Sequence, residues 1–298
     1  MTAIRTEKLW KRYGATVALD GLDLEVNEGE VYGYLGPNGA GKTTTIRLLL
    51  GLHRPSGGRA EVFDLDCWGD PVAAHRRVAY VAGEPALWPS MTAQETLEFL
   101  ARLRGGVDRG YQRQLVQLFR LELSTKVRAL SKGNRQKVAL IAALASRAEL
   151  LLLDEPTGGL DPLMERVFRD CIAEASKRGQ TVFLSSHVLA EVEAVCDRVG
   201  ILRAGRLVDQ GTLAELRHLN AQTLEVTFDG KAPKLAPLPG VAVAAMGVGG
   251  LRLEVSGPLR PVLAALADHP VVSLTSREQS LEEIFLHHYD HDDGRRDR

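Results

Sequence analysis

One short segment restricts the fold of this chain more than any other feature. Residues 36–43 read GPNGAGKT, which matches the pattern G-x-x-x-x-G-K-[ST]. A strand-like run, VYGYLG at 31–36, precedes the loop, and a helix-like run, KTTTIRLLLGL at 42–52, follows it. A strand, a glycine-rich turn and a helix in this order predict a phosphate-binding loop inside an α/β domain.

The residue types in this loop explain the prediction. Gly36, Gly39 and Gly41 let the backbone turn so that successive N–H groups face one concavity, and the following helix N-terminus attracts anions. Lys42 is placed to reach the β- and γ-phosphates of a nucleotide, and the Thr43 hydroxyl is placed to ligate Mg²⁺. A glycine-rich helix entry with an unrelated lysine is the alternative, and the flanking elements disfavour it.

Two acidic residues form a second candidate site further along the chain. Asp154 and Glu155 follow four leucines at 150–153, which predict a buried strand. Ligands of open α/β folds bind at the carboxyl ends of such strands. We therefore expect Asp154 to serve Mg²⁺ through a water, and Glu155 to polarise the water that attacks the phosphate. Two solvated acids at a strand end are the alternative.

Alternating strand-like and helix-like runs over residues 1 to about 218 predict an α/β fold with a largely parallel sheet. The expected strands lie at 31–36, 77–83, 149–154, 180–186 and 198–205. The expected helices lie at 42–52, 93–103, 134–146 and 163–178.

A composition shift after Asn220 predicts a domain boundary at 219–222. Beyond it, residues 222–289 fit a small α+β domain of split β-α-β type, with strands at 223–228, 251–257 and 271–276 and helices at 258–269 and 280–289. Residues 290–298 form a polar tail. Three histidines lie close to this tail, His287, His288 and His291. They allow a metal site, but a frayed terminus is the favoured interpretation.

Charge and composition exclude several classes of protein. There are 37 Lys and Arg against 38 Asp and Glu, so no strong field favours nucleic acid, and no nucleic-acid partner is expected. Cys67, Cys171 and Cys196 show neither a disulfide framework nor zinc-site spacing. The charged start lacks a signal peptide, and no apolar run approaches the roughly 20 residues of a membrane span. A cytosolic protein is expected, with any membrane role supplied by a partner.

Further motifs make residues 1 to about 218 resemble the ATP-binding subunits of ABC transporters. LSKGNRQK at 130–137 resembles the signature L-S-G-G-Q, and the chain also carries DEPTGGLDP at 154–162 and SSH at 185–187. The resemblance implies a P-loop NTPase-type nucleotide-binding domain with a helical subdomain at about 85–146. It also implies ATP and Mg²⁺ as ligands, and a homodimer that sandwiches two ATP molecules.

The resemblance assigns roles to residues that contact ATP within one subunit. Tyr13 would stack on adenine, and Asn38 and Thr44 would join the loop residues that hold the nucleotide. His187 would contact the γ-phosphate and keep Glu155 and the water in line. Without the resemblance, Tyr13 would be read as a packing residue and His187 as a structural strand end.

Other roles cross the dimer. Ser131 and Gly133 would contact the ATP held by the partner, because a hydroxyl and a backbone N–H at a helix start are donors for a phosphate. Asp161 would couple the two sites. The alternative for Ser131 is an ordinary helix cap.

Two departures from the family pattern stand out. Gly83 occupies the place of a glutamine that senses Mg²⁺ and the membrane partner, and Glu84 follows it. Either Glu84 substitutes as a metal ligand, or the contact is lost. Lys132 and Asn134 replace a glycine and a glutamine of the signature. Lys132 either brings a cation to the phosphate across the dimer or faces solvent.

The C-terminal run SLEEIFLHHY resembles ATPases of the bacterial drug- and antibiotic-efflux type, similar to the daunorubicin-resistance group. This resemblance implies an ATP-hydrolysing subunit that energises export of a drug, antibiotic or similar amphipathic compound through separate membrane subunits. The subunit would lie at the cytoplasmic face of the cell membrane.

Leu87, Trp88 and Pro89 are either contacts with the membrane subunit or core residues. Other interpretations are a soluble ABC ATPase acting on ribosomes, DNA or cofactor assembly, and an importer ATPase.

Overall fold

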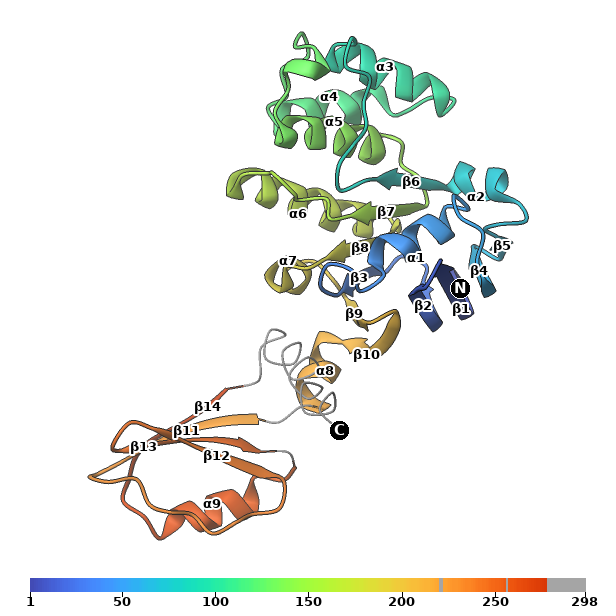
Figure 1. Ribbon diagram of the computed structural model, residues 1–298. Coiled ribbons are helices and arrows are strands. Elements are labelled where there is room, and N and C mark those ends of the chain that lie inside the picture. The colour runs from blue at the N-terminus through green and yellow to red at the C-terminus, as the bar shows by residue number, and fades with distance from the viewer. Residues whose placement is uncertain (220–221, 256, 278–298) are drawn as a thin grey trace. The chain divides into compact units, whose positions relative to one another are not determined.

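A six-stranded sheet with the order β10-β9-β3-β8-β7-β6 forms the centre of the N-terminal unit (Figure 1). The computed structural model describes residues 1–219, 222–255 and 257–277. The strands are β3 (Val31–Leu35), β6 (Val78–Val81), β7 (Leu150–Asp154), β8 (Thr181–Ser186), β9 (Arg198–Arg203) and β10 (Arg206–Thr212). Adjacent strands from β9 to β6 run parallel, which confirms the predicted α/β fold with a largely parallel sheet.

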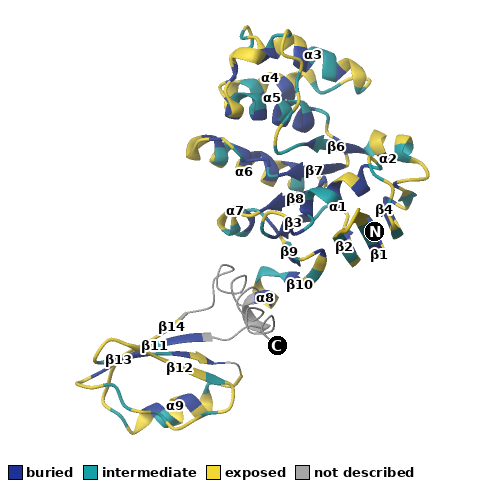
Figure 2. Ribbon diagram, viewed as in Figure 1, coloured by how far each residue is buried: buried dark blue, intermediate teal, exposed yellow. Residues whose placement is uncertain are grey.

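The middle strands of this sheet are buried on both faces. Every residue of β3, β7 and β8 is buried (Figure 2). This burial explains why β7 is a continuous run of leucines rather than an alternating pattern. Phe183 lies in the core with its ring centroid 5.9 Å from that of Tyr32 and 5.0 Å from that of Tyr34. This aromatic group fixes β3 against β8 below the phosphate-binding loop.

We expect Phe183→Ala to lower the free energy of unfolding of the N-terminal unit by about 3–5 kcal/mol, because it leaves a cavity in a fully buried core. Urea unfolding of the full chain, followed by circular dichroism, measures the loss. Val208→Ala, at a position that is 40% exposed, is the control. A loss below about 1 kcal/mol for Phe183→Ala would contradict this account of the core.

Helices surround the sheet. They are α1 (Lys42–Leu49), α2 (Pro71–Arg77), α3 (Ala93–Leu103), α4 (Arg109–Leu118), α5 (Lys132–Ala145), α6 (Pro162–Lys177) and α7 (Leu189–Glu193), with a 3₁₀ turn at Val127–Ala129. The four predicted helices correspond to α1, α3, α5 and α6. Helices α3 and α4 both pack on α5 and form a helical group beside the sheet (Figure 1).

Capping residues set where these helices begin. The Thr92 side chain accepts a hydrogen bond from the Glu95 backbone, and the Glu95 side chain accepts one from the Thr92 backbone, so α3 starts with a capping box. Asp161 accepts from the Met164 N–H at the start of α6, where Pro162 occupies the first turn.

An antiparallel sheet with the order β2-β1-β4-β5 was not predicted. Its strands are β1 (Thr2–Tyr13), β2 (Thr16–Asn27), β4 (Gly57–Val62) and β5 (Leu65–Asp66). Several charged residues of β1, such as Glu7 and Lys8, are exposed while Ile4 and Leu9 are buried. A strand with one solvated face carries many charges, so the chain start gives no apolar run to recognise.

The C-terminal unit contains β11 (Gln222–Phe228), β12 (Val241–Met246), β13 (Gly250–Val255), α9 (Arg260–Ala267) and β14 (Val271–Arg277). Strands β13 and β14 are both antiparallel to β11, which lies between them, so they run parallel to each other. Helix α9 connects them, which is the predicted split β-α-β arrangement. Strand β12 was missed, because its short run of valine and alanine lacks clear strand signals.

The division into two compact units falls between Gln210 and Gly211, ahead of the composition shift after Asn220. Helix α8 (Leu213–Leu219) is grouped with the second unit, which explains the earlier position. The predicted helix at 280–289, the tail at 290–298 and the three histidines lie outside the described residues.

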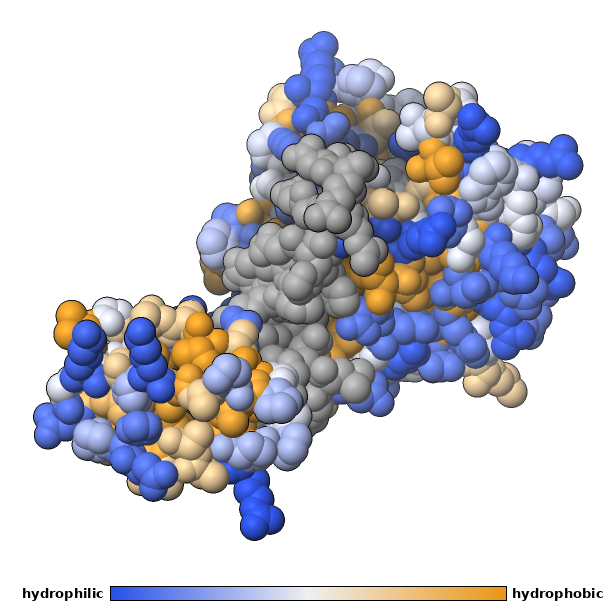
Figure 3. All heavy atoms as spheres, turned by 60° about the horizontal axis from the view of Figure 1, so that its bottom comes forward, coloured by the Kyte–Doolittle hydropathy of each residue, from blue (hydrophilic) through white to orange (hydrophobic). Residues whose placement is uncertain are grey.

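The C-terminal unit exposes apolar side chains on its surface (Figure 3). They come from β12, the turn after it, α9 and β14, and are Val243, Met246, Val248, Leu263, Val271, Val272 and Leu274. Within residues 1–219, 222–255 and 257–277, no helix has both the length and the hydrophobicity required to cross a bilayer.

The three cysteines are free and buried in separate places of the N-terminal unit. Burial raises the pKa of the Cys67 and Cys171 thiols to about 12, and it also raises the pKa of Cys196. These thiols therefore stay protonated at neutral pH, where a thiol is a poor nucleophile.

Candidate nucleotide-binding and hydrolysis site

The phosphate-binding loop connects β3 to α1. A Cβ atom on Gly36 would lie 2.7 Å from the Leu202 carbonyl oxygen, and one on Gly41 would lie 2.6 Å from that of Ala18. Gly41 also has a φ of 116°, so a side chain is excluded there by space and by backbone conformation. Helix α1 begins at Lys42, and the first N–H groups of a helix lack intrahelical acceptors. The loop therefore offers N–H donors to an anion.

Lys42 lies inside this loop and is only 5% exposed. Its Nζ donates to the carbonyl oxygens of Gly36, at 2.6 Å, and Pro37, at 3.2 Å. It also lies 3.4 Å from Glu155 Oε1. A buried ammonium needs such partners, and they hold the charge beside the acid that follows β7.

Asp154 binds two hydroxyl groups from neighbouring elements. Its Oδ2 accepts a hydrogen bond from Thr43 Oγ1 at 2.9 Å, and its Oδ1 accepts one from Ser185 Oγ at 2.6 Å. The hydroxyl of Thr43 and the carboxylate of Asp154 are hard oxygen donors in contact, which fits a site for Mg²⁺. Ser185 was not predicted individually, although it lies in the SSH motif.

Glu155 and His187 contact each other as the resemblance implies. His187 Nδ1 lies 3.2 Å from Glu155 Oε1, with the two side chains 51% and 32% exposed. The Glu155 backbone N–H donates to the Ser185 carbonyl oxygen at 3.1 Å, and its φ is 47°. Such a φ is uncommon for a non-glycine residue and often marks a functional turn. The two predicted catalytic residues thus lie together, beside Lys42.

A cavity of about 430 Å³ opens next to these residues. Its lining includes predicted residues and four that were not singled out, Arg47, Tyr80, Ala82 and Gly158. The full lining consists of Asn38, Thr43, Arg47, Tyr80, Ala82, Gly83, Glu84, Lys132, Asp154, Glu155 and Gly158. Burial, and next the charge of Asp154, raise the pKa of Tyr80, so its hydroxyl is neutral. Arg47 and Tyr80 lie outside any motif, and only the packing of α1 against β7 and the pairing of β6 with β7 bring them here.

The two departures from the family pattern meet beside this cavity. A Cβ on Gly83 would lie 3.2 Å from the Asp154 carbonyl oxygen, so this loop lies against the end of β7. The next residue, Glu84, is 85% exposed, and its Oε1 pairs with Lys132 Nζ at 3.2 Å. Lys132 is 53% exposed, so it faces solvent in part and forms a surface ion pair with Glu84. In the structure the Glu84 carboxylate pairs with the Lys132 ammonium, not with a metal ligand. The role of Glu84 as a metal ligand therefore stays a prediction.

The signature residues begin α5. Ser131 is exposed and caps this helix, accepting a hydrogen bond from the Asn134 N–H at 3.2 Å. Gly133 is buried, and a Cβ there would lie 2.1 Å from the Gly159 carbonyl oxygen. The signature therefore packs on the turn that precedes Asp161. The two segments predicted to act across the dimer, the signature and Asp161, thus belong to one surface.

We expect Gly133→Ala to reduce ATP hydrolysis at least about tenfold. The added methyl group must push α5 away from the 158–159 turn, which would displace both the signature and Asp161. Steady-state phosphate release measures the effect. Gly57→Ala is the control, because its Cβ would meet its nearest neighbour at 3.8 Å. Wild-type turnover in Gly133→Ala would show that ATP hydrolysis does not depend on this packing.

Tyr13 ends β1 and is 39% exposed. Its hydroxyl lies 3.0 Å from His53 Nδ1, and Lys11 Nζ lies 4.8 Å from the ring centroid. A partly exposed ring offers a surface for a base to stack on, which fits the predicted adenine contact better than core packing. The roles of Tyr13, Asn38, Thr44, Ser131 and Asp161 toward a nucleotide stay predictions.

Comparison with known proteins places this geometry in a family. Residues 19–158 match the family described as "ABC transporter". The daunorubicin resistance ATP-binding protein DrrA3 of Streptomyces coeruleorubidus is 36% identical, over 96% of this chain and 95% of that protein. The bacitracin transport ATP-binding protein BcrA of Bacillus licheniformis is 37% identical, over 75% of this chain and 74% of that protein.

A solved structure described as the ATP-binding subunit of an ABC transporter is 33% identical to this chain. Its TM-score is 0.68, with 72% of this chain and 92% of that chain covered. The similarity to whole ATP-binding subunits, and not to the loop alone, confirms the predicted family. This chain belongs to the ATP-binding subunits of ABC transporters, and it binds and hydrolyses ATP.

Proposed function

We propose that this chain energises the export of a drug, antibiotic or similar amphipathic compound. The observation that carries the proposal is its similarity, over 96% of its length, to a relative named for daunorubicin resistance. The match includes the C-terminal unit, which the ATPase chemistry by itself does not require. A relative named for bacitracin transport supports the same class of substrate.

For hydrolysis, we assign the phosphates to the N–H groups of the loop and to Lys42. Glu155 accepts a proton from the attacking water, and His187, 3.2 Å from its carboxylate, keeps that carboxylate in position. Thr43 and Asp154 are the residues that would hold Mg²⁺. This ion supplies positive charge that stabilises the transferring phosphoryl group.

The ATP-binding subunits of ABC transporters work as dimers together with membrane subunits. For this chain we propose a homodimer in which Ser131 and Gly133 of one subunit face the ATP held by the other, and Asp161 lies at the contact. The exposure of Ser131 and Asp161 supports this arrangement. It would place the chain at the cytoplasmic face of the membrane.

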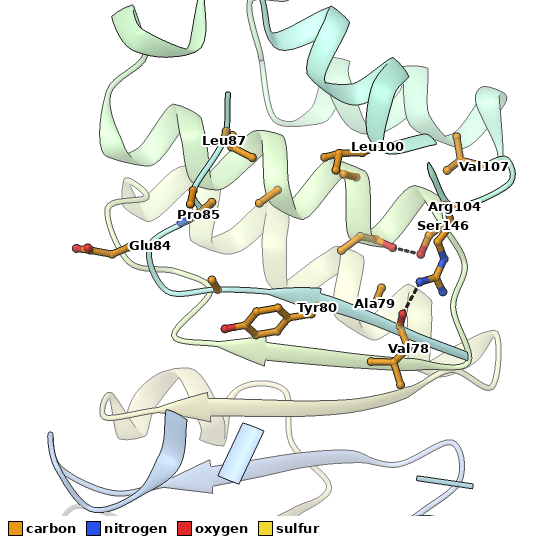
Figure 4. Close-up of a pocket in the computed structure, with 15 residues that line it drawn as sticks. Val78, Ala79, Tyr80, Glu84, Pro85, Leu87, Leu100, Arg104, Val107 and Ser146 are labelled. Carbon is orange, nitrogen blue, oxygen red and sulfur yellow. Dashed lines mark hydrogen bonds between the residues drawn. The ribbon is translucent and has the colours of Figure 1, made fainter. Parts of the chain in front are cut away.

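We propose that the membrane subunit docks in a cavity of about 440 Å³ between β6, α3 and α5 (Figure 4). Leu87 and Leu100 line this cavity, and Arg104 lies at one end, where it donates to the Val78 carbonyl oxygen. Burial lowers the pKa of Arg104, but this group stays charged. Trp88 lies beside Phe99 and is 44% exposed, so it remains available to a partner. An apolar segment fits this lining.

A pull-down from the native host tests the proposal. Tagged Glu155→Gln protein is isolated in mild detergent with Mg-ATP, and its partners are identified by mass spectrometry. Recovery of a multi-spanning membrane protein is the expected result. Recovery of ribosomal proteins or a soluble assembly complex, without a membrane protein, would favour the soluble ABC ATPase. Tagged Lys42→Ala protein is the matched control for recovery that depends on bound ATP.

Growth of the host separates export from import. A strain with Glu155→Gln in place of the wild-type chain is expected to become more sensitive to amphipathic antibiotics, because they are no longer removed. Unchanged sensitivity across a broad panel, together with failure to grow on a limiting nutrient, would favour an importer.

A further inference from the structure

Glu191 is a carboxylate near the hydrolysis site that no motif singled out. It lies on α7 and accepts two hydrogen bonds from hydroxyl groups on different segments. Thr157 Oγ1 donates to its Oε1 at 2.6 Å, and Ser186 Oγ donates to its Oε2 at 2.9 Å. Thr157 is 8% exposed and Ser186 is 2% exposed, so both hydroxyls are shielded from water.

The two segments held by Glu191 are those that carry Glu155 and His187. Thr157 lies in the turn two residues after Glu155, and Ser186 directly precedes His187. Ser186 Oγ also accepts a hydrogen bond from the Val188 N–H at 2.9 Å, which fixes the backbone on the other side of His187. The carboxylate of Glu191 thus ties the turn after β7 to the end of β8, next to the contact between Glu155 and His187.

We propose that Glu191 is a positioning residue for ATP hydrolysis, which holds His187 and Glu155 at the distance that water activation requires. The inference rests on the roles proposed above for those two residues. Short hydrogen bonds to a carboxylate are among the stronger ones in proteins, and their loss leaves two buried hydroxyls without this acceptor. A displacement of about 1 Å between reacting groups is enough to cost a hundredfold in rate.

Steady-state ATP hydrolysis by the purified full chain tests the inference. Glu191→Ala is expected to lower kcat about ten- to hundredfold and to change KM for ATP less than about threefold, because the phosphate-binding loop is untouched. Glu191→Gln is expected to recover part of the rate, since its amide oxygen still accepts one hydroxyl. Asp170→Ala is the matched control, because it removes an exposed carboxylate from α6 outside the cavity.

A second series separates positioning from a structural role. Thr157→Val combined with Ser186→Ala removes both donors and is expected to reproduce the loss of Glu191→Ala. In a His187→Ala background, Glu191→Ala is expected to cause little further loss, because the distance between Glu155 and that histidine no longer matters once the histidine is removed. Wild-type kcat in Glu191→Ala overturns the inference. A loss that multiplies with that of His187→Ala, or that comes with a matching rise in KM and fall in Tm, also overturns it.

The outcome is distinguishable from a failure of the proposed catalytic roles. If Glu155→Gln hydrolyses ATP at the wild-type rate, the assignment of Glu155 is wrong whatever Glu191 does. If Glu155→Gln is inactive and Glu191→Ala is fully active, only the positioning role is wrong.

Discussion

Glu155→Gln is expected to lower the rate of ATP hydrolysis at least about 100-fold while leaving the affinity for ATP within about threefold of wild type. The amide cannot accept the proton of the attacking water, whereas the substitution leaves the loop and Lys42, to which we assign the phosphates, in place. Phosphate release at saturating ATP measures turnover. Equilibrium binding of a fluorescent ATP analogue measures affinity.

The matched control for this variant is Asp170→Asn, which neutralises an exposed carboxylate on α6 away from the cavity. It should retain wild-type turnover. Undiminished hydrolysis by Glu155→Gln would remove Glu155 as the base. A parallel loss of ATP affinity would show instead that its contact with Lys42, at 3.4 Å, is needed to hold the loop.

Lys42→Ala is expected to weaken ATP binding about 10- to 100-fold, and turnover falls with it, because a hydrogen bond to a charged group contributes about 1.5–3 kcal/mol. Removing this side chain also takes a donor away from the Gly36 and Pro37 carbonyl oxygens, although the Ala40 N–H still donates to Pro37 at 3.2 Å. Calorimetric titration with Mg-ATP measures the affinity. Thermal unfolding with and without Mg-ATP gives a second readout, because a ligand that binds only the folded chain raises Tm by an amount that grows with its concentration relative to Kd.

Lys137→Ala, on α5, controls for the loss of one positive charge from the surface. Its stabilisation by Mg-ATP should match that of the wild type. Wild-type affinity in Lys42→Ala would contradict the assignment of the phosphate-binding loop.

The central sheet and the residues that we assign to hydrolysis could be singled out from the sequence because each leaves a local signature. Four consecutive leucines before Asp154 indicate a strand that is buried on both faces, and β7 is that strand. The parallel order of β3, β8 and β7 then brings the ends of these strands to one edge. Lys42, Asp154, Glu155 and His187, far apart in sequence, meet there.

The elements that were missed have weaker local signatures. Strand β1 has a solvated face rich in charge, so it resembles a surface segment until β2 and β4 pair with it. Arg47 and Tyr80 belong to ordinary helix and strand patterns, Ser185 is covered only by the SSH motif, and Glu191 lies in a short helix that was not predicted. Their roles depend on which neighbours lie beside them, and periodicity carries no information about that.

The sequence by itself determined the phosphate-binding loop, the acids after the leucine strand, the family and most of the central strands. Each depends on residue types at fixed short spacings. The tertiary structure alone decided that Glu84 pairs with Lys132, that Gly133 packs on Gly159, and that Glu191 joins Thr157 to Ser186. These contacts link segments whose separation is set by the packing of the helices on the sheet. Which side chains meet across such a gap is set by the packing of the folded core, and the local sequence does not determine it.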